Sequence, residues 1–283
     1  MIADPWLLYG LTTLVGLAVG SFLNVVVHRL PARLEYGWRG ECRELLGLEA
    51  EQDPPPPGLW RPGSRCPHCG HGIRAWENIP ILSWLLLRGR CAACGRPIGW
   101  HYPLVEALTA LLSLLVIWRL GPTWAGAAGL GFTWALIALA LIDLDTQLLP
   151  DVITLPLVWA GLLLSLKGVF TDPASAITGA AAGYLALWTV YHGFRLATGK
   201  RGMGHGDFKL LAAVGAWLGW QYLPQVILLS AFVGALVGLA LILFRGHRRE
   251  IPIPFGPYLA AAAWIGLLWG PEINRIYLLW AHM

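Results

Sequence analysis

The sequence predicts an α-helical polytopic membrane protein with about eight transmembrane helices and one small cytoplasmic domain between the first and second of them. Its composition supports this fold class, because 57% of the residues are hydrophobic and only 13% are charged. A mean hydropathy of +0.60 is too high for an ordinary soluble domain. Apolar runs long enough to cross a bilayer alternate with short polar segments. Nothing in this composition points to nucleic-acid binding.

The first apolar run extends from Trp6 to about His28, and residues 1–29 are predicted to be the first transmembrane helix. Arg29 and Arg33 follow the run at once, whereas a cleavable signal peptide carries its positive charge before the apolar stretch. Positive charges favour the cytoplasmic side of a membrane. We therefore expect the N-terminus to face outside and the arginines to face the cytoplasm.

Three polar residues of this run share one helical face. Ser21, Asn24 and His28 are spaced at i, i+3 and i+7 within GSFLNVVVHRLP, so they lie on the same side of a helix. Such residues hold neighbouring helices together more often than they catalyse reactions, and helix packing is the interpretation that the spacing favours.

Residues 30–102 form the predicted cytoplasmic domain, because this stretch is rich in arginine and proline and contains no run long enough to span a bilayer. Its main feature is a pair of CxxC motifs, RCPHCG and RCAACG, separated by about twenty residues. This spacing is typical of a structural zinc ribbon, and the glycine after each motif suits a tight turn that points two thiolates at one ion. The predicted zinc ligands are Cys66, Cys69, Cys91 and Cys94.

Disulfides are the alternative for the same four cysteines. The many arginines place the domain in the reducing cytoplasm, where disulfides are rare, and this favours zinc. Cys42 has no partner by spacing and is expected to be a buried thiol. The segment WENIPILSWLLLRGR is too short to span, and its Trp76 and Trp84 suit a segment that rests against the headgroups or docks on the membrane domain.

Residues 103–283 are predicted to form a membrane domain. Its apolar runs lie near 103–118, 123–142, 152–166, 174–194, 210–220, 225–244 and 255–269. The run at 210–220 is short for a span. Counting it as a crossing places Arg245, Arg248 and Arg249 in the cytoplasm, in agreement with the positive-inside rule.

This topology gathers aspartates at the cytoplasmic ends of helices that are distant in sequence. Asp143, Asp145 and Asp151 lie in IDLDTQLLPD, and Asp207 lies in GMGHGDFK. An ionisable residue at the mouth of a membrane span indicates a functional site. Two carboxylates that share one site titrate as a pair, so that one acts as a general base toward water while the other donates to a carbonyl. The pattern therefore indicates aspartic-peptidase chemistry.

The glycines around Asp207 have competing interpretations. A glycine-rich phosphate loop needs a preceding strand and a βαβ unit, whereas apolar helical runs flank GMGHG. Helix packing by small residues accounts for the glycines but leaves Asp207 unexplained. Close approach of an extended substrate backbone to the acid accounts for both.

Taken in order, GSFLNVVVHRLP, the two CxxC motifs, HYPLVE, IDLDTQLLPD, GMGHGDFK and IPFGPYL resemble the bacterial type IV prepilin peptidases, membrane aspartic peptidases with a GxGD motif. The resemblance covers almost the whole chain. It implies cleavage of the leader of type IV prepilins and type II secretion pseudopilins at the cytoplasmic face of the inner membrane. It further implies methylation of the new N-terminus from S-adenosylmethionine.

The same resemblance implies that Asp143 and Asp207 are the catalytic aspartates, with Asp145 and Asp151 as neighbours. His101 stands where the family motif has an arginine. No residues are assigned to S-adenosylmethionine, because no part of the cytoplasmic domain is typical of a nucleotide-binding βαβ unit.

Two charged residues near these motifs have open roles. Glu106 enters its span near the cytoplasmic face and is a candidate contact for a substrate amine or for the methyl donor. Lys209 lies two residues after Asp207, where a lysine at a helix end extends to the interface more often than it tunes a neighbouring charge.

Two functions from other classes compete with the peptidase. An ion-coupled transporter would use Asp143 and Asp207 as a proton or cation relay, but relay acids usually lie near the bilayer midplane in matching positions of two repeats. No internal repeat is evident here. A zinc-linked scaffold for pilus or secretion assembly would keep its function after loss of both aspartates.

Overall fold

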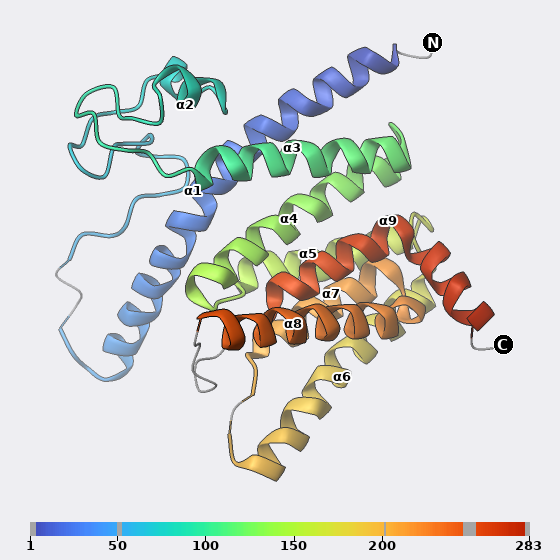
Figure 1. Cartoon of the computed structure of the whole chain (residues 1–283). Coiled ribbons are helices and arrows are strands. Elements are labelled where there is room, and N and C mark those ends of the chain that lie inside the picture. Colours follow the sequence, from blue (N-terminus) through green and yellow to red (C-terminus); the bar gives the residue numbers. More distant parts are fainter. Residues whose placement is uncertain (1–3, 50–52, 201, 246–252, 281–283) are drawn as a thin grey trace. The chain divides into compact units, whose positions relative to one another are not determined.

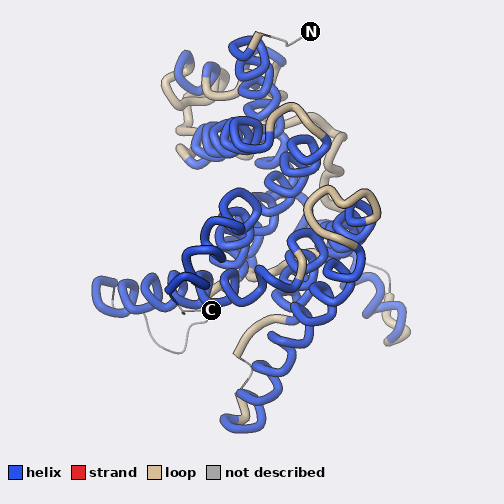
Figure 2. The backbone as a smooth tube through the Cα atoms, turned by 90° about the vertical axis from the view of Figure 1, so that its right-hand side faces the viewer, coloured by secondary structure: helices blue, strands red, loops and turns tan. Residues whose placement is uncertain are grey.

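The computed structural model of the chain describes residues 4–49, 53–200, 202–245 and 253–280. Figures 1 and 2 show that these residues form helices joined by loops. The helices in these ranges are α1 (Pro5–Leu45), η1 (Ala75–Asn78), α2 (Leu82–Leu86), α3 (His101–Leu120), α4 (Trp124–Thr146), α5 (Asp151–Ser165), α6 (Pro173–Thr198), α7 (His205–Leu218), η2 (Trp220–Tyr222), α8 (Leu223–Arg245) and α9 (Gly256–Trp280).

Each apolar run predicted from the sequence coincides with one of these helices. Among the described residues, four helices are long and apolar enough to cross a membrane: Pro5–Leu45, His101–Leu120, Trp124–Thr146 and Trp220–Phe244. The all-helical membrane fold is therefore confirmed in this coarser form, and the total of about eight spans stays a prediction. Arg248 and Arg249, which supported that count, lie outside the described residues.

Helix α1 continues well past the span predicted to end near His28. At its start, the Asp4 carboxylate accepts the N–H of Trp6 at 3.1 Å, and Pro5 occupies the first turn. The helix then runs for 41 residues and includes Pro31. The arginines that follow His28 therefore mark the predicted edge of the membrane segment and not the end of the helix.

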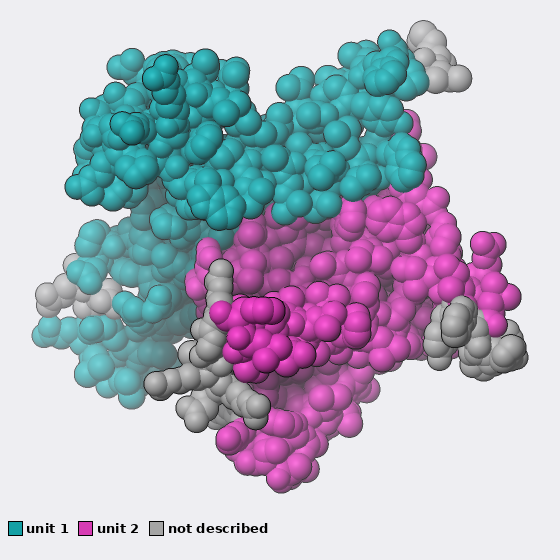
Figure 3. All heavy atoms as spheres, viewed as in Figure 1, with its two compact units in different colours: residues 1–118 teal, residues 119–283 magenta. Residues whose placement is uncertain are grey.

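Contacts divide the chain into two compact units, Met1–Trp118 and Arg119–Met283 (Figure 3). The domain boundaries predicted near residues 30 and 102 both fall inside the first unit. They stay predictions about which parts lie in the membrane and which in the cytoplasm.

Within the first unit, α1 and α3 cross at two glycines. A Cβ atom built on Gly16 would lie 2.7 Å from the Cα of Ala110, and one on Gly20 would lie 2.7 Å from the Cα of Glu106. Only glycine permits such close approach of two helix backbones. The crossing sets the start of α3, with Glu106, directly against the helical face that carries Ser21.

In this unit, the structure corrects the expectation for Cys42 and gives the surroundings of Trp84. Cys42 is exposed on α1, so the prediction of a buried thiol is wrong. The indole of Trp84 donates a hydrogen bond to the carbonyl of Ile98 at 3.2 Å and packs on Gly89. Trp84 is thus tied to the second CxxC loop, whereas Trp76 remains about half exposed.

Helix α7 is the centre of the second unit, where it packs against α5, α6 and α9 (Figure 1). Its residues from Leu210 to Leu218 are all buried. A Cβ on Gly215 would lie 2.1 Å from the carbonyl oxygen of Gly179, so α6 and α7 approach backbone to backbone. The indole of Trp217 donates to the carbonyl of Leu157 in α5 at 2.8 Å. These contacts fix the rotation of α7 and hence the direction in which its first turn faces.

Candidate active site

Asp143 lies in the last turn of α4, and the way this helix ends fixes the position of its carboxylate. Gln147 adopts a left-handed backbone with φ 55°, and its N–H donates to the carbonyl of Asp143 at 2.9 Å. The Asp143 side chain is buried, whereas Asp145 is exposed. A buried carboxylate needs hydrogen-bond donors. Asp143 finds one in the N–H of Gly256, which lies 2.9 Å from its Oδ2.

Asp207 lies in the first turn of α7, at a helix end. The helix begins at His205, directly after Gly204. The positive end of a helix favours a carboxylate in its first turn, which explains why the helix starts before the aspartate. Asp207 is 6% exposed, and its Oδ1 is buried without a hydrogen-bond partner among the described residues. Such an oxygen is costly in a purely structural role, so it is a candidate contact for water or substrate.

Leu149 contacts a glycine next to each of the two aspartates. A Cβ built on Gly206 would lie 2.6 Å from the Cβ of Leu149, and one built on Gly256 would lie 3.2 Å from its Cδ2. The leucine side chain therefore contacts both glycines, one beside Asp207 and one bonded to Asp143. The two carboxylates are close enough for the charge of Asp143 to act on Asp207. The structure thus brings together the two aspartates that the sequence singled out.

Helix ends also explain how two acids are accommodated in this apolar unit. Asp207 lies at the N-terminal end of α7, and Asp143 accepts the N–H of the first residue of α9. Both carboxylates therefore face the positive end of a helix, where unpaired N–H groups favour negative charge. The sequence did not indicate the contact between Gly256 and Asp143. The motif IPFGPYL contains this glycine, but only the folded chain shows its partner, 113 residues away.

The glycines before Asp207 fulfil different roles. Gly206 faces Leu149, and a Cβ on Gly202 would lie 2.9 Å from the ring of Phe194, so packing explains both of them. A Cβ on Gly204 would meet nothing closer than the Asp207 Oδ2, at 3.8 Å. Gly204 is therefore the position where the predicted approach of a substrate backbone to the acid is sterically open.

Lys209 contacts Asp151, and neither interpretation offered from the sequence describes this. Its Nζ lies 2.7 Å from both carboxylate oxygens of Asp151, in the first turn of α5. The pair is partly exposed, so it contributes little to stability. It joins the start of α5 to α7 next to the loop that carries Leu149.

The four cysteines of the two CxxC motifs come together in the first unit. Their sulfur atoms all lie within 4.8 Å of one another, and Cys66 Sγ is 3.9 Å from Cys94 Sγ. Zn–S bonds of about 2.3 Å in a tetrahedron place the sulfurs about 3.8 Å apart, so the four thiols fit a zinc ion. A disulfide requires about 2.05 Å, and no disulfide links any of the five cysteines, all of which are described.

The two CxxC loops have the same backbone hydrogen bonds, as their shared sequence pattern predicts. The N–H of Gly70 donates to Cys66 at 3.0 Å, and that of Gly95 donates to Cys91 at 2.9 Å. Both glycines have positive φ, 71° and 68°, which confirms the need for glycine after each motif. In the first loop, the N–H groups of Cys69 and His68 lower the pKa of the Cys66 thiol to about 6. This favours the thiolate, which is the form that binds metal.

His71 of the first loop is hydrogen-bonded to an acidic side chain. His71 Nε2 lies 3.1 Å from a carboxylate oxygen of Glu77, which also accepts the N–H of Arg74 at 2.8 Å. The Arg74 amide, and then the His71 imidazole, hold the pKa of Glu77 below its usual range. The pair ties the first CxxC loop to η1.

Comparison with known proteins identifies the family. Residues 14–120 match the family model described as the bacterial peptidase A24 N-terminal domain. Residues 130–239, which include both aspartates, match the type IV leader peptidase family. The chain belongs to the type IV leader peptidase family. No solved structure matches the chain.

Relatives in this family match over nearly their full length, and each has the name prepilin leader peptidase/N-methyltransferase. The Aeromonas hydrophila protein is 58% identical over 97% of this chain and 95% of its own length. The Pseudomonas aeruginosa protein is 56% identical, with 95% and 93% covered. The Xanthomonas campestris protein is 47% identical, with 95% and 94% covered. The transporter alternative has no support among these relatives of the leader peptidase family.

Proposed function

We propose that this leader peptidase cleaves the leader from type IV prepilins and type II secretion pseudopilins and then methylates the new N-terminal residue. One observation in the structure carries the peptidase half. Two buried aspartates from α4 and α7 face one site, and a carboxylate oxygen of Asp207 has no partner among the described residues. The names of the relatives support both activities.

The chemistry follows from the pair of acids. Asp143 and Asp207 hold a water molecule against the scissile carbonyl, with one acid ionised and the other protonated. The ionised acid removes a proton as the water oxygen attacks the carbonyl carbon, and the protonated acid stabilises the developing oxyanion. The C–N bond then breaks, and the amine leaves with a proton. Gly204 provides room for the substrate backbone beside the Asp207 carboxylate.

The cysteine cluster holds a structural zinc ion through Cys66, Cys69, Cys91 and Cys94. Four thiolates close the coordination shell, so the ion braces residues 30–102 and takes no part in the reaction. Residues 30–102 therefore form the cytoplasmic zinc-binding domain of the enzyme. Residues 1–29 are its first transmembrane helix, and residues 103–283 are its membrane aspartic peptidase domain.

The enzyme lies in the bacterial inner membrane as a multi-pass protein, with the N-terminus outside and both aspartates at the cytoplasmic face. The apolar helices and the family support a membrane location. The arginines after the first span support the orientation. A cytoplasmic site suits a substrate whose leader stays in the cytoplasm while its apolar helix lies in lipid.

S-adenosylmethionine supplies the methyl group when bound. The new N-terminal amine forms a bond to the methyl carbon, the sulfur keeps the electron pair of the broken S–C bond, and the amine loses a proton. Cleavage must come first, because the amine does not exist before the peptide bond breaks.

The test is mass spectrometry of a prepilin incubated with the purified full-length enzyme, with and without S-adenosylmethionine. We expect a shortened product that gains one methyl group only when the donor is present. Asp207→Asn should give uncut substrate while the protein remains folded. An uncut substrate with the unsubstituted enzyme would refute the peptidase function, and a cut but unmethylated product with the donor would refute the methyltransferase half alone.

A further inference from the structure

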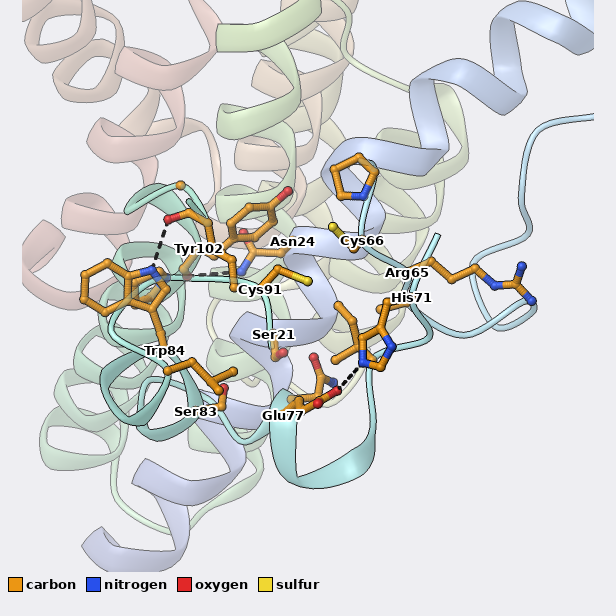
Figure 4. A pocket seen from close by; sticks show the side chains of 18 of the residues that line it. Ser21, Asn24, Arg65, Cys66, His71, Glu77, Ser83, Trp84, Cys91 and Tyr102 are labelled. Carbon is orange, nitrogen blue, oxygen red and sulfur yellow. Dashed lines mark hydrogen bonds and ion pairs between the residues drawn. The ribbon is translucent and has the colours of Figure 1, made fainter. Parts of the chain in front are cut away.

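The first unit contains a pocket of about 390 Å³ that the cleavage mechanism does not use (Figure 4). Its volume lies within the range of about 300–1,000 Å³ that small-molecule sites occupy. Four parts of the unit line it: the polar face of α1, the two CxxC loops, the η1–α2 segment and the start of α3. Ser21, Asn24 and His28 all line this pocket, so the face that the sequence assigned to helix packing borders a cavity.

A buried carboxylate faces this pocket. Glu106 is only 8% exposed, and its Oε2 accepts the N–H of Ile81 at 2.7 Å. Among the residues that the structure describes, no lysine, arginine or histidine forms an ion pair with it. A buried negative charge without a positive partner is costly. A cationic ligand in the pocket would supply that partner.

An apolar aromatic wall completes the pocket. The Trp84 indole is held by its hydrogen bond to Ile98 and by contact with Gly89, so the ring has a fixed position. Tyr102 also lines the pocket, and its ring lies against that of His101, with 4.1 Å between the ring centroids. Aromatic rings in fixed positions bind flat heteroaromatic groups well, because they lose little conformational freedom on binding.

We propose that this pocket binds S-adenosylmethionine, with Glu106 facing the positive charge of the ligand and with Trp84 and Tyr102 forming the wall for its adenine ring. The inference rests on the proposed methyltransferase activity and assigns that activity a site. The ligand has a sulfonium cation and a flat base, and the pocket offers a buried acid and an aromatic wall.

The test measures equilibrium binding by calorimetry with the full-length enzyme in nanodiscs, and not catalysis. Three ligands differ in charge at one position: S-adenosylmethionine carries a sulfonium, its amine analogue sinefungin an ammonium, and S-adenosylhomocysteine a neutral sulfur. Glu106→Gln should weaken binding of the two cations by about 10- to 100-fold, because interactions with a charged group exceed those between neutral groups. It should change binding of S-adenosylhomocysteine much less.

Two further variants keep the test informative if Glu106→Gln perturbs the Ile81 loop. Ser83 is buried and lines the pocket, so Ser83→Leu should weaken all three ligands by filling the space. Glu35→Gln makes the same chemical change as Glu106→Gln at an exposed position of α1 and should leave all three affinities unchanged. Thermal unfolding and zinc content report the fold of each variant.

The inference would be overturned if both pocket variants bound S-adenosylmethionine as tightly as the unsubstituted enzyme. It would also be overturned if a folded Glu106→Gln lost as much affinity for the neutral ligand as for the two cations. Methylation of a cut pilin is measured on the same preparations. If the unsubstituted enzyme neither binds the donor nor methylates, the proposed methyltransferase activity fails and the inference fails with it. If it methylates while the pocket variants bind normally, only the inference fails.

Discussion

The most informative single substitution at the site is Gly256→Ala, because it moves Asp143 without changing any charge. The added Cβ would lie 2.6 Å from the Oδ2 of Asp143 and 3.1 Å from its Cγ. Ordinary contacts of a Cβ begin near 3.4 Å, so the carboxylate must move by about 0.8 Å, which also stretches its 2.9 Å hydrogen bond to the Gly256 N–H. A displacement of about 1 Å at a reacting group costs about 100-fold in rate. We therefore expect kcat/KM for prepilin cleavage to fall about 100-fold.

The assay is cleavage of a prepilin in detergent by matched preparations of Gly256→Ala and Gly131→Ala. A Cβ on Gly131 in α4 would meet nothing within 4 Å, so this control should cleave normally. Methylation of a pilin that is already cut should be unaffected by Gly256→Ala, which separates a local effect from loss of the fold. Cleavage at the unsubstituted rate by a folded Gly256→Ala would refute the proposal that the Gly256 contact positions a catalytic Asp143.

Three other predictions concern the zinc site, the Lys209 ion pair and a helix cap. Cys94→Ser should abolish bound zinc in metal analysis and lower the thermal unfolding temperature, because one ligand of the closed shell is lost; unsubstituted protein without zinc would refute the metal site. Lys209→Met and Asp151→Asn should each slow cleavage only severalfold and lower the free energy of unfolding by less than about 1 kcal/mol, since the pair is partly exposed. The double variant should lose no more than either single variant. An additive loss would show that the two side chains act separately. Asp172 caps α6 by accepting the N–H of Ser175 at 3.0 Å, and the hydroxyl and amide of Ser175 hold the pKa of Asp172 below its usual range. Its ionised form therefore stabilises the protein above about pH 4 and loses this contribution as the pH falls through the lowered pKa, so the difference in unfolding temperature between the unsubstituted protein and Asp172→Asn should shrink in acid.

The helices could be predicted from the sequence because their apolar runs are long and polar residues separate them. Their ends were harder to predict. The apolar run near 210–220 did not show that α7 begins at His205, where a carboxylate in the first turn is favourable. At α1, the positive charges after His28 indicate a membrane edge, yet the helix continues to Leu45. Charge patterns report the surroundings of a helix and not its hydrogen bonding.

Local motifs identified the chemistry, but partners far apart in sequence had to come from the fold. The spacing of the CxxC motifs and their glycines predicted both loops of the metal centre, because the constraint acts within a few residues. The sequence also singled out Asp143 and Asp207. It gave no signal for the bond of Asp143 to Gly256 or for the pairing of Lys209 with Asp151, since those contacts depend on helix packing.

We propose that Asp143, and not its neighbour Asp145, works with Asp207 in cleavage. The most direct test is kcat/KM for prepilin cleavage by Asp143→Asn and Asp145→Asn, measured side by side on folded protein. Asp143 is buried beside Asp207, whereas Asp145 is exposed. We predict a loss of at least about 100-fold for Asp143→Asn, as for removal of a general acid or base, and near-normal cleavage by Asp145→Asn. The reverse order, or retained cleavage by Asp143→Asn, would contradict it.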